Sequence, residues 1–197
     1  MGQGFRTQVL IEPGVYIEIA TMLLVIPISW VFSWFCAVLL HEFCHCLSLY
    51  LLGYRIFEIR FRSVGAEIIC SPTTTFHGIL CTAAGPVGSL FALLFSAIIP
   101  QFSLCALFQT VLNLIPVFPL DGGRIVRFLL SYLHNDTLEK MLCITIEWVF
   151  ITIIAFLSIM ALFWLKLGIL PLCIPLFLLL KAQKIKIPCK QTLHRVQ

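Results

Sequence analysis

The sequence predicts an all-α membrane protein with about six transmembrane helices and a small β-hairpin after the second helix. Of its 197 residues, 60% are hydrophobic and only 11% are charged, whereas a soluble domain is about 45–50% apolar and about 25% charged. Apolar runs long enough to cross a bilayer recur along the chain. One short stretch instead alternates apolar and charged residues, which indicates strands.

Six apolar segments are each expected to cross the membrane, at residues 15–30, 33–52, 78–99, 103–118, 143–165 and 167–180. The first two cannot form one helix, because that helix would be about 57 Å long at 1.5 Å per residue, and the hydrocarbon core is about 30 Å thick. We expect the turn between them at Pro27, Ser29 and Ser33, beside the pair Trp30 and Trp34.

Residues 54–70 follow a different period. Three apolar side chains alternate with three charged ones, Phe57, Ile59 and Phe61 with Glu58, Arg60 and Arg62. This is strand periodicity, and Gly65 offers a turn after which Glu67–Cys70 can return. Because lipid cannot satisfy an open strand edge, we expect the hairpin to be buried in protein or to lie at the membrane interface.

The basic residues predict the orientation of the chain. With six spans, the two termini and the loops 53–77 and 119–142 share one side, and every Lys and Arg except Lys166 lies there. The positive-inside rule then places both termini in the cytoplasm. The tail 181–197 is expected to be a basic cytoplasmic segment that binds anionic lipid. No basic cluster is interleaved with aromatic residues, so we expect no nucleic-acid partner.

The second apolar segment contains an H-E-x-x-H motif, His41-Glu42-Phe43-Cys44-His45. Residues four apart on an α-helix share a face, so both imidazoles can reach one zinc ion. Glu42 stays near that face and is the expected general base for the attacking water. A bound zinc would polarise the scissile carbonyl.

A chance pattern on a surface helix is the alternative interpretation of this motif. It is disfavoured because a charged residue at the centre of a membrane helix costs about 2.5–3.5 kcal/mol, and such residues are functional by default. Cys44 and Cys46 flank His45 but lie off its helical face, so neither is an expected ligand. The nine cysteines are odd in number and lie mostly in apolar runs, and we interpret them as reduced packing residues.

A catalytic zinc needs a third protein ligand, and Asp121 is the best candidate. It follows an apolar run that two prolines interrupt, and Gly122 and Gly123 are expected to let the backbone turn sharply. This places a carboxylate on irregular backbone at membrane depth, which is tolerated only beside a protein-lined cavity. The alternatives are a carboxylate that caps a helix beginning near Gly123, or one that pairs with Arg124.

Three other polar side chains are expected to have no part in the chemistry. His77 lies in a polar loop and is expected to be solvated, with a gate at the site as the alternative. Glu18 and Glu147 lie near the ends of apolar segments and are expected to reach the membrane interface by snorkelling.

The two motifs together resemble the site-2 protease family of intramembrane metalloproteases. The resemblance rests on H-E-x-x-H in one transmembrane segment and on N-x-x-P-x-x-P-L-D-G-G, which begins at Asn113, in a later one. It spans residues 15–130, the expected catalytic core of a single domain 1–197 whose residues 143–180 form C-terminal transmembrane helices. The short chain looks closest to the compact bacterial branch that includes the sporulation sigma-factor processing protease, which implies a bacterial plasma membrane.

By that resemblance, His41, His45 and Asp121 hold one Zn²⁺ per chain, Glu42 is the general base and Asn113 helps to position the substrate. The implied reaction is hydrolysis of a peptide bond in or beside the transmembrane helix of a membrane protein, typically a single-pass one. A regulatory membrane partner is a further expectation. The hairpin is expected to pair with the unwound substrate through main-chain hydrogen bonds.

The segment Thr82–Pro86 also resembles the family's Ala-Gly-Pro element, but Ser89 stands where the family often has asparagine. Small residues here suit close helix packing equally well: Ala83, Ala84, Gly85 and Gly88. Two other classes of function stay open. A zinc transporter or metal sensor would use the same ligands without a general base, and a membrane scaffold would bind no zinc. The intact Glu42 favours the enzyme.

Overall fold

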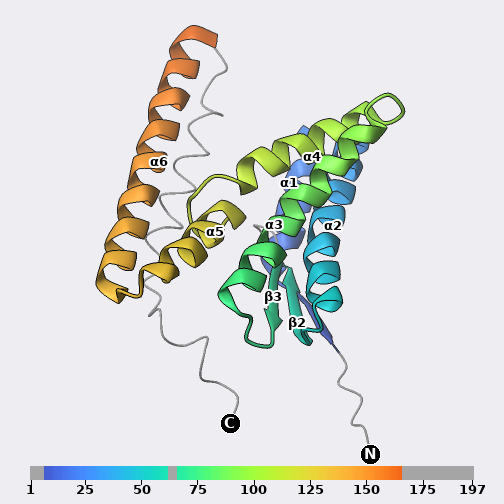
Figure 1. The fold of residues 1–197 in the computed structure, drawn as a ribbon. Coiled ribbons are helices and arrows are strands. Elements are labelled where there is room, and N and C mark those ends of the chain that lie inside the picture. The colour runs from blue at the N-terminus through green and yellow to red at the C-terminus, as the bar shows by residue number, and fades with distance from the viewer. Residues whose placement is uncertain (1–6, 62–65, 166–197) are drawn as a thin grey trace, which may run out of the picture. The chain divides into compact units, whose positions relative to one another are not determined.

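The computed structural model describes residues 7–61 and 66–165, and the chain divides into two compact units, Met1–Asn113 and Leu114–Gln197 (Figure 1). The described residues are mainly helical with one small sheet, so the predicted fold class is confirmed. A helix occupies each predicted apolar segment up to residue 165. The predicted sixth segment 167–180, the tail 181–197 and the hairpin turn at Gly65 lie outside the described residues.

The first unit is built around three helices that pack against one another, namely α2 (Ile28–Leu51), α3 (Thr75–Phe91) and α4 (Pro100–Asn113). A short helix, α1 (Pro13–Val25), precedes α2, and a 3-10 turn, η1 (Ala92–Phe95), extends α3. In Figure 1, α2, α3 and α4 run together as one group.

Small residues hold the three helices together. Ala37 of α2 and Ala106 of α4 are both completely buried, and Ala92 of η1 packs with them and with Cys105. Larger side chains cover this cluster: Trp34, Leu40 and Phe102. Lipid is as apolar as the side chains, so close van der Waals packing at small residues is what stabilises helix pairs in a membrane.

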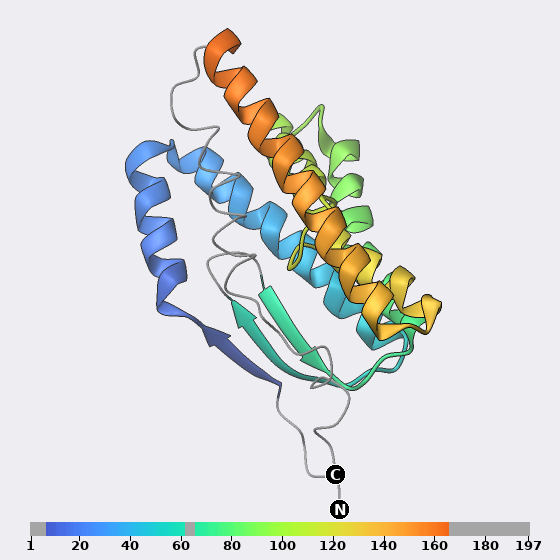
Figure 2. The ribbon, with the colours of Figure 1, turned by 90° about the vertical axis from the view of Figure 1, so that its left-hand side faces the viewer.

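The break between α1 and α2 falls at Pro27, which is the N-cap of α2 and follows an extended Ile26. Figure 2 shows the sharp turn that results. The prediction of a turn at Pro27 is confirmed, but Ser29 and Ser33 lie inside α2. The second helix therefore begins at Ile28 rather than at residue 33, because proline fits the start of a helix, where its missing N–H costs nothing.

A three-stranded sheet precedes α3 in the order β1 (Gln8–Ile11), β2 (Ile56–Phe61) and β3 (Ala66–Cys70) (Figure 2). β2 and β3 are the predicted antiparallel hairpin, with Ile59 opposite Ile68. β1 pairs with β2 in parallel, which the sequence did not predict, because four residues are too few to show a period. β2 is therefore the central strand, and β1 and β3 are the two edge strands of the described sheet.

The second unit contains α5 (Asp121–Leu130), the 3-10 turn η2 (Ser131–Leu133) and α6 (Asp136–Leu165), and α5 packs against α6. α6 begins at Asp136 rather than at residue 143. The Oδ1 atom of Asn135 accepts hydrogen bonds from the backbone N–H groups of Thr137 and Leu138, and this cap starts the helix early.

Within residues 7–61 and 66–165, three helical stretches are long and apolar enough to cross a membrane: Ile28–Leu51, Thr75–Phe95 and Asp136–Ala161. α1, with 13 residues, is a shorter apolar helix, and a straight span needs about 20 residues. Large apolar side chains cover the surface, and Leu24, Ile98 and Leu94 are each more than three-quarters exposed. Such a surface suits lipid, so the chain is a membrane protein, and the number of crossings stays a prediction.

Candidate metal centre

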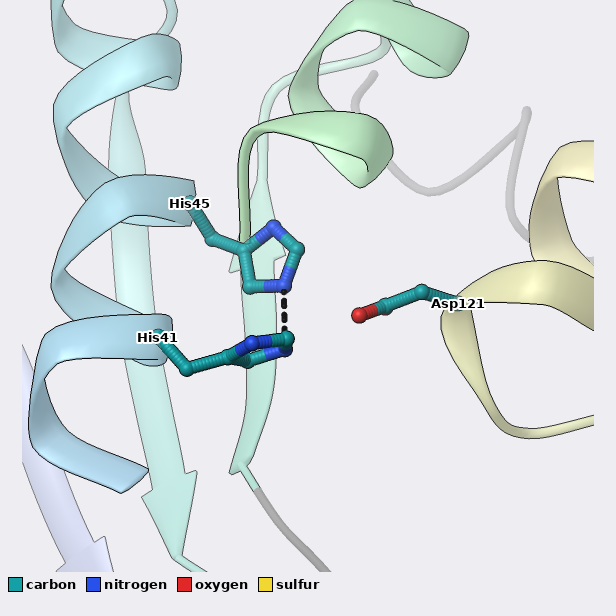
Figure 3. A group of neighbouring side chains, drawn as sticks. All are labelled: His41, His45 and Asp121. Carbon is teal, nitrogen blue, oxygen red and sulfur yellow. Dashed lines mark hydrogen bonds between the residues drawn. The ribbon is translucent and has the colours of Figure 1, made fainter. Parts of the chain in front are cut away.

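His41 and His45 project from one face of α2, as the H-E-x-x-H spacing predicts. Their Nε2 atoms lie 3.2 Å apart, and the two rings meet edge to face (Figure 3). Both side chains are buried, at 1% and 8% exposed. Two buried imidazole nitrogens that face each other are well placed to share one cation.

A partner on α3 holds each ring from its other side. The Nδ1 atom of His45 lies 2.7 Å from the backbone carbonyl oxygen of Cys81. A carbonyl only accepts, so Nδ1 carries the proton and Nε2 of the neutral ring keeps its lone pair. His41 Nδ1 lies 2.9 Å from the hydroxyl of Ser89, which is completely buried. Metal-binding histidines almost always have such partners on the ring nitrogen that does not bind the metal.

α3 approaches the two histidines closely because residue 85 is glycine. A Cβ at Gly85 would lie 2.2 Å from Nε2 of His45 and 2.8 Å from Nε2 of His41. A Cβ at Gly88 would lie 2.1 Å from the Sγ atom of Cys44. The predicted close packing of these small residues is confirmed, and Gly85 also leaves space directly at the two ring nitrogens.

Glu42 and Asn113 lie in the same unit as the histidine pair. Glu42 is only 9% exposed, and its Oε1 accepts a hydrogen bond of 3.2 Å from the backbone N–H of Ala66, the first residue of β3. Asn113 is the last residue of α4, and its Nδ2 lies 3.3 Å from Nε2 of His41. The first unit thus brings four of the five predicted site residues together on α2 and α4.

Asp121, in the second unit, is the first residue of α5, and its side chain is 6% exposed. A carboxylate there is favoured by the partial positive charge of the helix N-terminus. The N-cap is Leu120, so the alternative in which Asp121 caps a helix beginning near Gly123 does not hold.

Gly122 and Gly123 permit a close contact rather than a sharp turn. Both lie within α5, and Gly53 has the only positive φ among the glycines that the structure describes. A Cβ at Gly122 would lie 2.2 Å from the carbonyl oxygen of Leu114, and one at Gly123 would lie 2.5 Å from the nitrogen of Phe118. The prediction of a glycine turn was therefore wrong: residues 114–118 fold back onto the first turn of α5, and only glycine leaves room for them.

Glu147 of α6 holds this folded-back segment. Its Oε1 accepts hydrogen bonds from the backbone N–H of Phe118, at 3.3 Å, and from the guanidinium of Arg127, at 3.2 Å. The guanidinium carbon of Arg127 lies 3.9 Å from the centre of the Phe118 ring. The side chain of Glu147 is only 17% exposed, so the prediction that it reaches the interface by snorkelling was wrong.

His41, His45 and Asp121 form a group that could hold a metal ion. Each offers one ligand atom, and these atoms all lie within 4.8 Å of one another (Figure 3). In the part of the chain that the structure describes, the group includes neither Cys44 nor Cys46.

Sequence reasoning missed several residues that support the site. Ser89 was recognised only as a departure from the family pattern, and its position three residues after Pro86 was the one signal available. Glu147 was assigned to the membrane interface, because no local pattern connects it with its partner Arg127, 20 residues away. His77 lies in the first turn of α3 and hydrogen-bonds the hydroxyl of Tyr54 at 2.7 Å, so its placement in a loop was wrong.

Part of the sequence matches one protein-family model, and the fold is similar to one solved structure. Residues 68–157 match the sequence model of peptidase family M50. The solved structure of the site-2 protease from Methanocaldococcus jannaschii is similar, with a TM-score of 0.62 and 23% identity over 89% of each chain. No curated protein matches the chain significantly. The resemblance of this chain to the site-2 proteases of peptidase family M50 is thereby confirmed.

Proposed function

We propose that the chain is a zinc metalloendopeptidase that hydrolyses a peptide bond in or near a transmembrane segment of a membrane-protein substrate. The observation that carries the proposal is the group formed by His41, His45 and Asp121, whose ligand atoms lie within 4.8 Å of one another. Glu42, which a protease needs and a zinc carrier does not, follows His41 on the same helix.

The donor set suits one Zn²⁺ per chain. Zinc binds imidazole nitrogen and carboxylate oxygen, and its catalytic sites use three protein ligands and leave one position open. The hydrogen bond from His45 Nδ1 to Cys81 leaves Nε2 with the lone pair that a ligand needs. When bound, the ion would supply the Lewis acid that activates water and polarises the scissile carbonyl.

Glu42 would act as the general base. Glu42 is buried, and its carboxylate accepts a hydrogen bond from the N–H of Ala66. From there it would accept a proton from the attacking water and return it to the leaving amine, as the glutamate of this motif does. Asn113 would donate its Nδ2–H to a substrate carbonyl, and its position 3.3 Å from Nε2 of His41 supports that role.

The hairpin offers a place for the unwound substrate. A peptide bond inside a helix is protected by its own hydrogen bonds, so the substrate must become extended before it is cleaved. β3 is an edge strand, and its first residue contacts Glu42. An extended segment that adds to β3 would therefore lie beside the general base. The distribution of basic residues supports a multi-pass protein with both termini in the cytoplasm. The resemblance to the compact bacterial branch of the site-2 proteases supports a bacterial plasma membrane.

Co-expression of the chain with a panel of single-pass membrane proteins tests the proposal. The wild type and Glu42→Gln are compared for cleavage by immunoblot and for zinc by elemental analysis of purified protein. We expect Glu42→Gln to keep its zinc and to lose cleavage by about 10²–10⁴-fold, because general base catalysis contributes about that much.

Glu18→Gln is the matched control, since it makes the same chemical change in α1, outside the site. It should cleave as the wild type does. Cleavage by Glu42→Gln at the wild-type rate would contradict the protease assignment and would favour a metal carrier or sensor. Zinc-free wild-type protein would favour a scaffold.

A further inference from the structure

We propose that Glu147 and Arg127 form a clamp that holds the backbone at Phe118 and so presents Asp121 as a metal ligand. The inference rests on the proposed function, because it assigns positioning residues to the proposed zinc site. Neither residue is expected to touch the substrate or the ion.

Three contacts define the clamp. Glu147 accepts from the N–H of Phe118 at 3.3 Å and from Arg127 at 3.2 Å, while Arg127 lies over the Phe118 ring at 3.9 Å. The backbone and the side chain of one residue are thus both held, from two different helices. A hydrogen bond to an ionised acceptor is stronger than one between neutral groups, and a cation over an aromatic face adds to it.

The segment before Asp121 does not provide hydrogen-bond acceptors for all of its own backbone N–H groups. Val117 N–H donates to the carbonyl of Ile115 and Leu120 N–H to that of Val117, at 2.8 and 3.0 Å. The prolines at 116 and 119 have no N–H to contribute. Phe118 N–H lies between them, and its acceptor is a side chain of another helix. Backbone groups at membrane depth must be satisfied within the protein, so Glu147 completes the segment.

The charge of Glu147 is costly where it lies. It is inside Asp136–Ala161, one of the three stretches that could cross a membrane. Ionisable residues there are rare and are retained with a partner and a function. An uncharged side chain on α6 would pack against Phe118 without that cost. The carboxylate is therefore explained by what it binds, namely Arg127 and the N–H of Phe118.

Movement of Phe118 would be passed on to Asp121. The nitrogen of Phe118 is the closest atom to a Cβ built at Gly123, at 2.5 Å, so the backbone at 118 rests on the first turn of α5. Asp121 is the first residue of that turn. The neighbouring Val117 is completely buried against Ile151 of α6. Loss of the clamp would leave the contact between Val117 and Ile151 in place but would release the backbone N–H of Phe118.

Cobalt substitution gives a direct test, because the visible absorption of Co²⁺ reports its ligands. Wild type, Asp121→Ala, Glu147→Gln and Glu147→Leu are purified in detergent and titrated with Co²⁺. We expect Asp121→Ala to change the spectrum and both Glu147 variants to shift it in the same direction, with Co²⁺ affinity lowered about 10-fold or more, as for other residues that support metal ligands. The Gln side chain keeps a hydrogen-bond acceptor but has no charge. The Co²⁺ affinity of Glu147→Gln should therefore lie between those of the wild type and Glu147→Leu.

Hydrogen exchange of the peptide spanning residues 114–124 supplies a readout that does not depend on metal. We expect faster exchange in both Glu147 variants without added metal. Ser158→Ala, which alters another buried polar residue of α6, is the control and should match the wild type in both measurements. A Glu147→Leu protein that misfolds would lose protection throughout the chain, and the decision then rests on Glu147→Gln.

The outcomes separate this inference from the function on which it rests. If Asp121→Ala changes the cobalt spectrum and neither Glu147 variant does, the clamp is refuted and the zinc site stands. If Asp121→Ala itself leaves the spectrum and the affinity unchanged, Asp121 is not a ligand, and both proposals fail.

Discussion

The Nε2 atoms of His41 and His45 lie 3.2 Å apart, and both rings are held from α3, at Cys81 and at Ser89. α2 thus supplies the two imidazoles, and α3 holds the orientation of both rings and sets the tautomer of His45. The backbone of α3 must come close to the two rings, which explains the small residues in this helix. The arrangement also separates residues that would bind the metal from residues that orient the ligands.

Loss of the Ser89 hydroxyl should weaken metal binding without changing the fold. In Ser89→Ala, Nδ1 of His41 loses its 2.9 Å partner, and we expect zinc affinity to fall about 10–100-fold. Competition with a chromogenic chelator measures it. Ser103→Ala is the control, because this buried hydroxyl bonds the carbonyl of Ala92 and not a histidine. Equal affinities in the two variants would show that the His41–Ser89 contact has no role.

A methyl group at residue 85 should abolish the site. In Gly85→Ala the Cβ would lie 2.2 Å from Nε2 of His45, so the rings must move and zinc should be lost. Gly88→Ala perturbs the same helix contact but meets Cys44 instead. We therefore expect Gly88→Ala to retain more zinc than Gly85→Ala, as measured by elemental analysis. The reverse order would mean that helix packing, rather than space at the nitrogens, is what glycine provides.

The open edge of β3 should matter for substrate and not for metal. The N–H of Ala66 points to Glu42, away from β2, and outward N–H groups alternate in an antiparallel ladder, so that of Ile68 also points outward. We expect Ile68→Pro to lower cleavage while zinc content stays at the wild-type level.

Ile68→Ala is the control for this substitution, because it removes the same side chain and keeps the N–H. It should cleave better than Ile68→Pro. Similar cleavage by the two variants would argue that substrate does not pair with this edge.

Asn113 should affect cleavage more than metal binding. Its Nδ2 lies 3.3 Å from Nε2 of His41, but it is not one of the three residues whose ligand atoms form the group. We expect Asn113→Ala to keep one zinc per chain and to cleave slowly in the co-expression assay. Gln109→Ala, one turn earlier in α4, is the comparison and should cleave faster than Asn113→Ala. Loss of zinc from Asn113→Ala would make Asn113 part of the metal site instead.

The three residues that form the group could be predicted from the sequence, whereas most of the contacts that support them could not. H-E-x-x-H predicts its own geometry, because helical spacing alone brings His41 and His45 to one face. Asp121 could be predicted from the cost of placing a carboxylate in lipid and from the motif that contains it.

The supporting contacts could not be predicted, because each joins positions that no local pattern connects. β1 pairs with a strand 50 residues away, with Gln8 opposite Glu58, and Glu147 bonds Phe118 and Arg127 across the second unit. Hydropathy also misplaced the start of α6, because the side chain of Asn135 caps this helix before its apolar residues begin.

Zinc binding by the purified chain and by its Asp121→Ala variant is the most direct test of a zinc site formed by His41, His45 and Asp121. We expect one zinc per wild-type chain and an affinity that falls at least about 100-fold in Asp121→Ala, since an ion held by three side chains loses one of them. Asp121→Asn keeps the shape of the side chain and removes its charge, so its zinc affinity should lie between those of the wild type and Asp121→Ala. A zinc affinity that is the same in all three proteins would mean that Asp121 does not bind the ion.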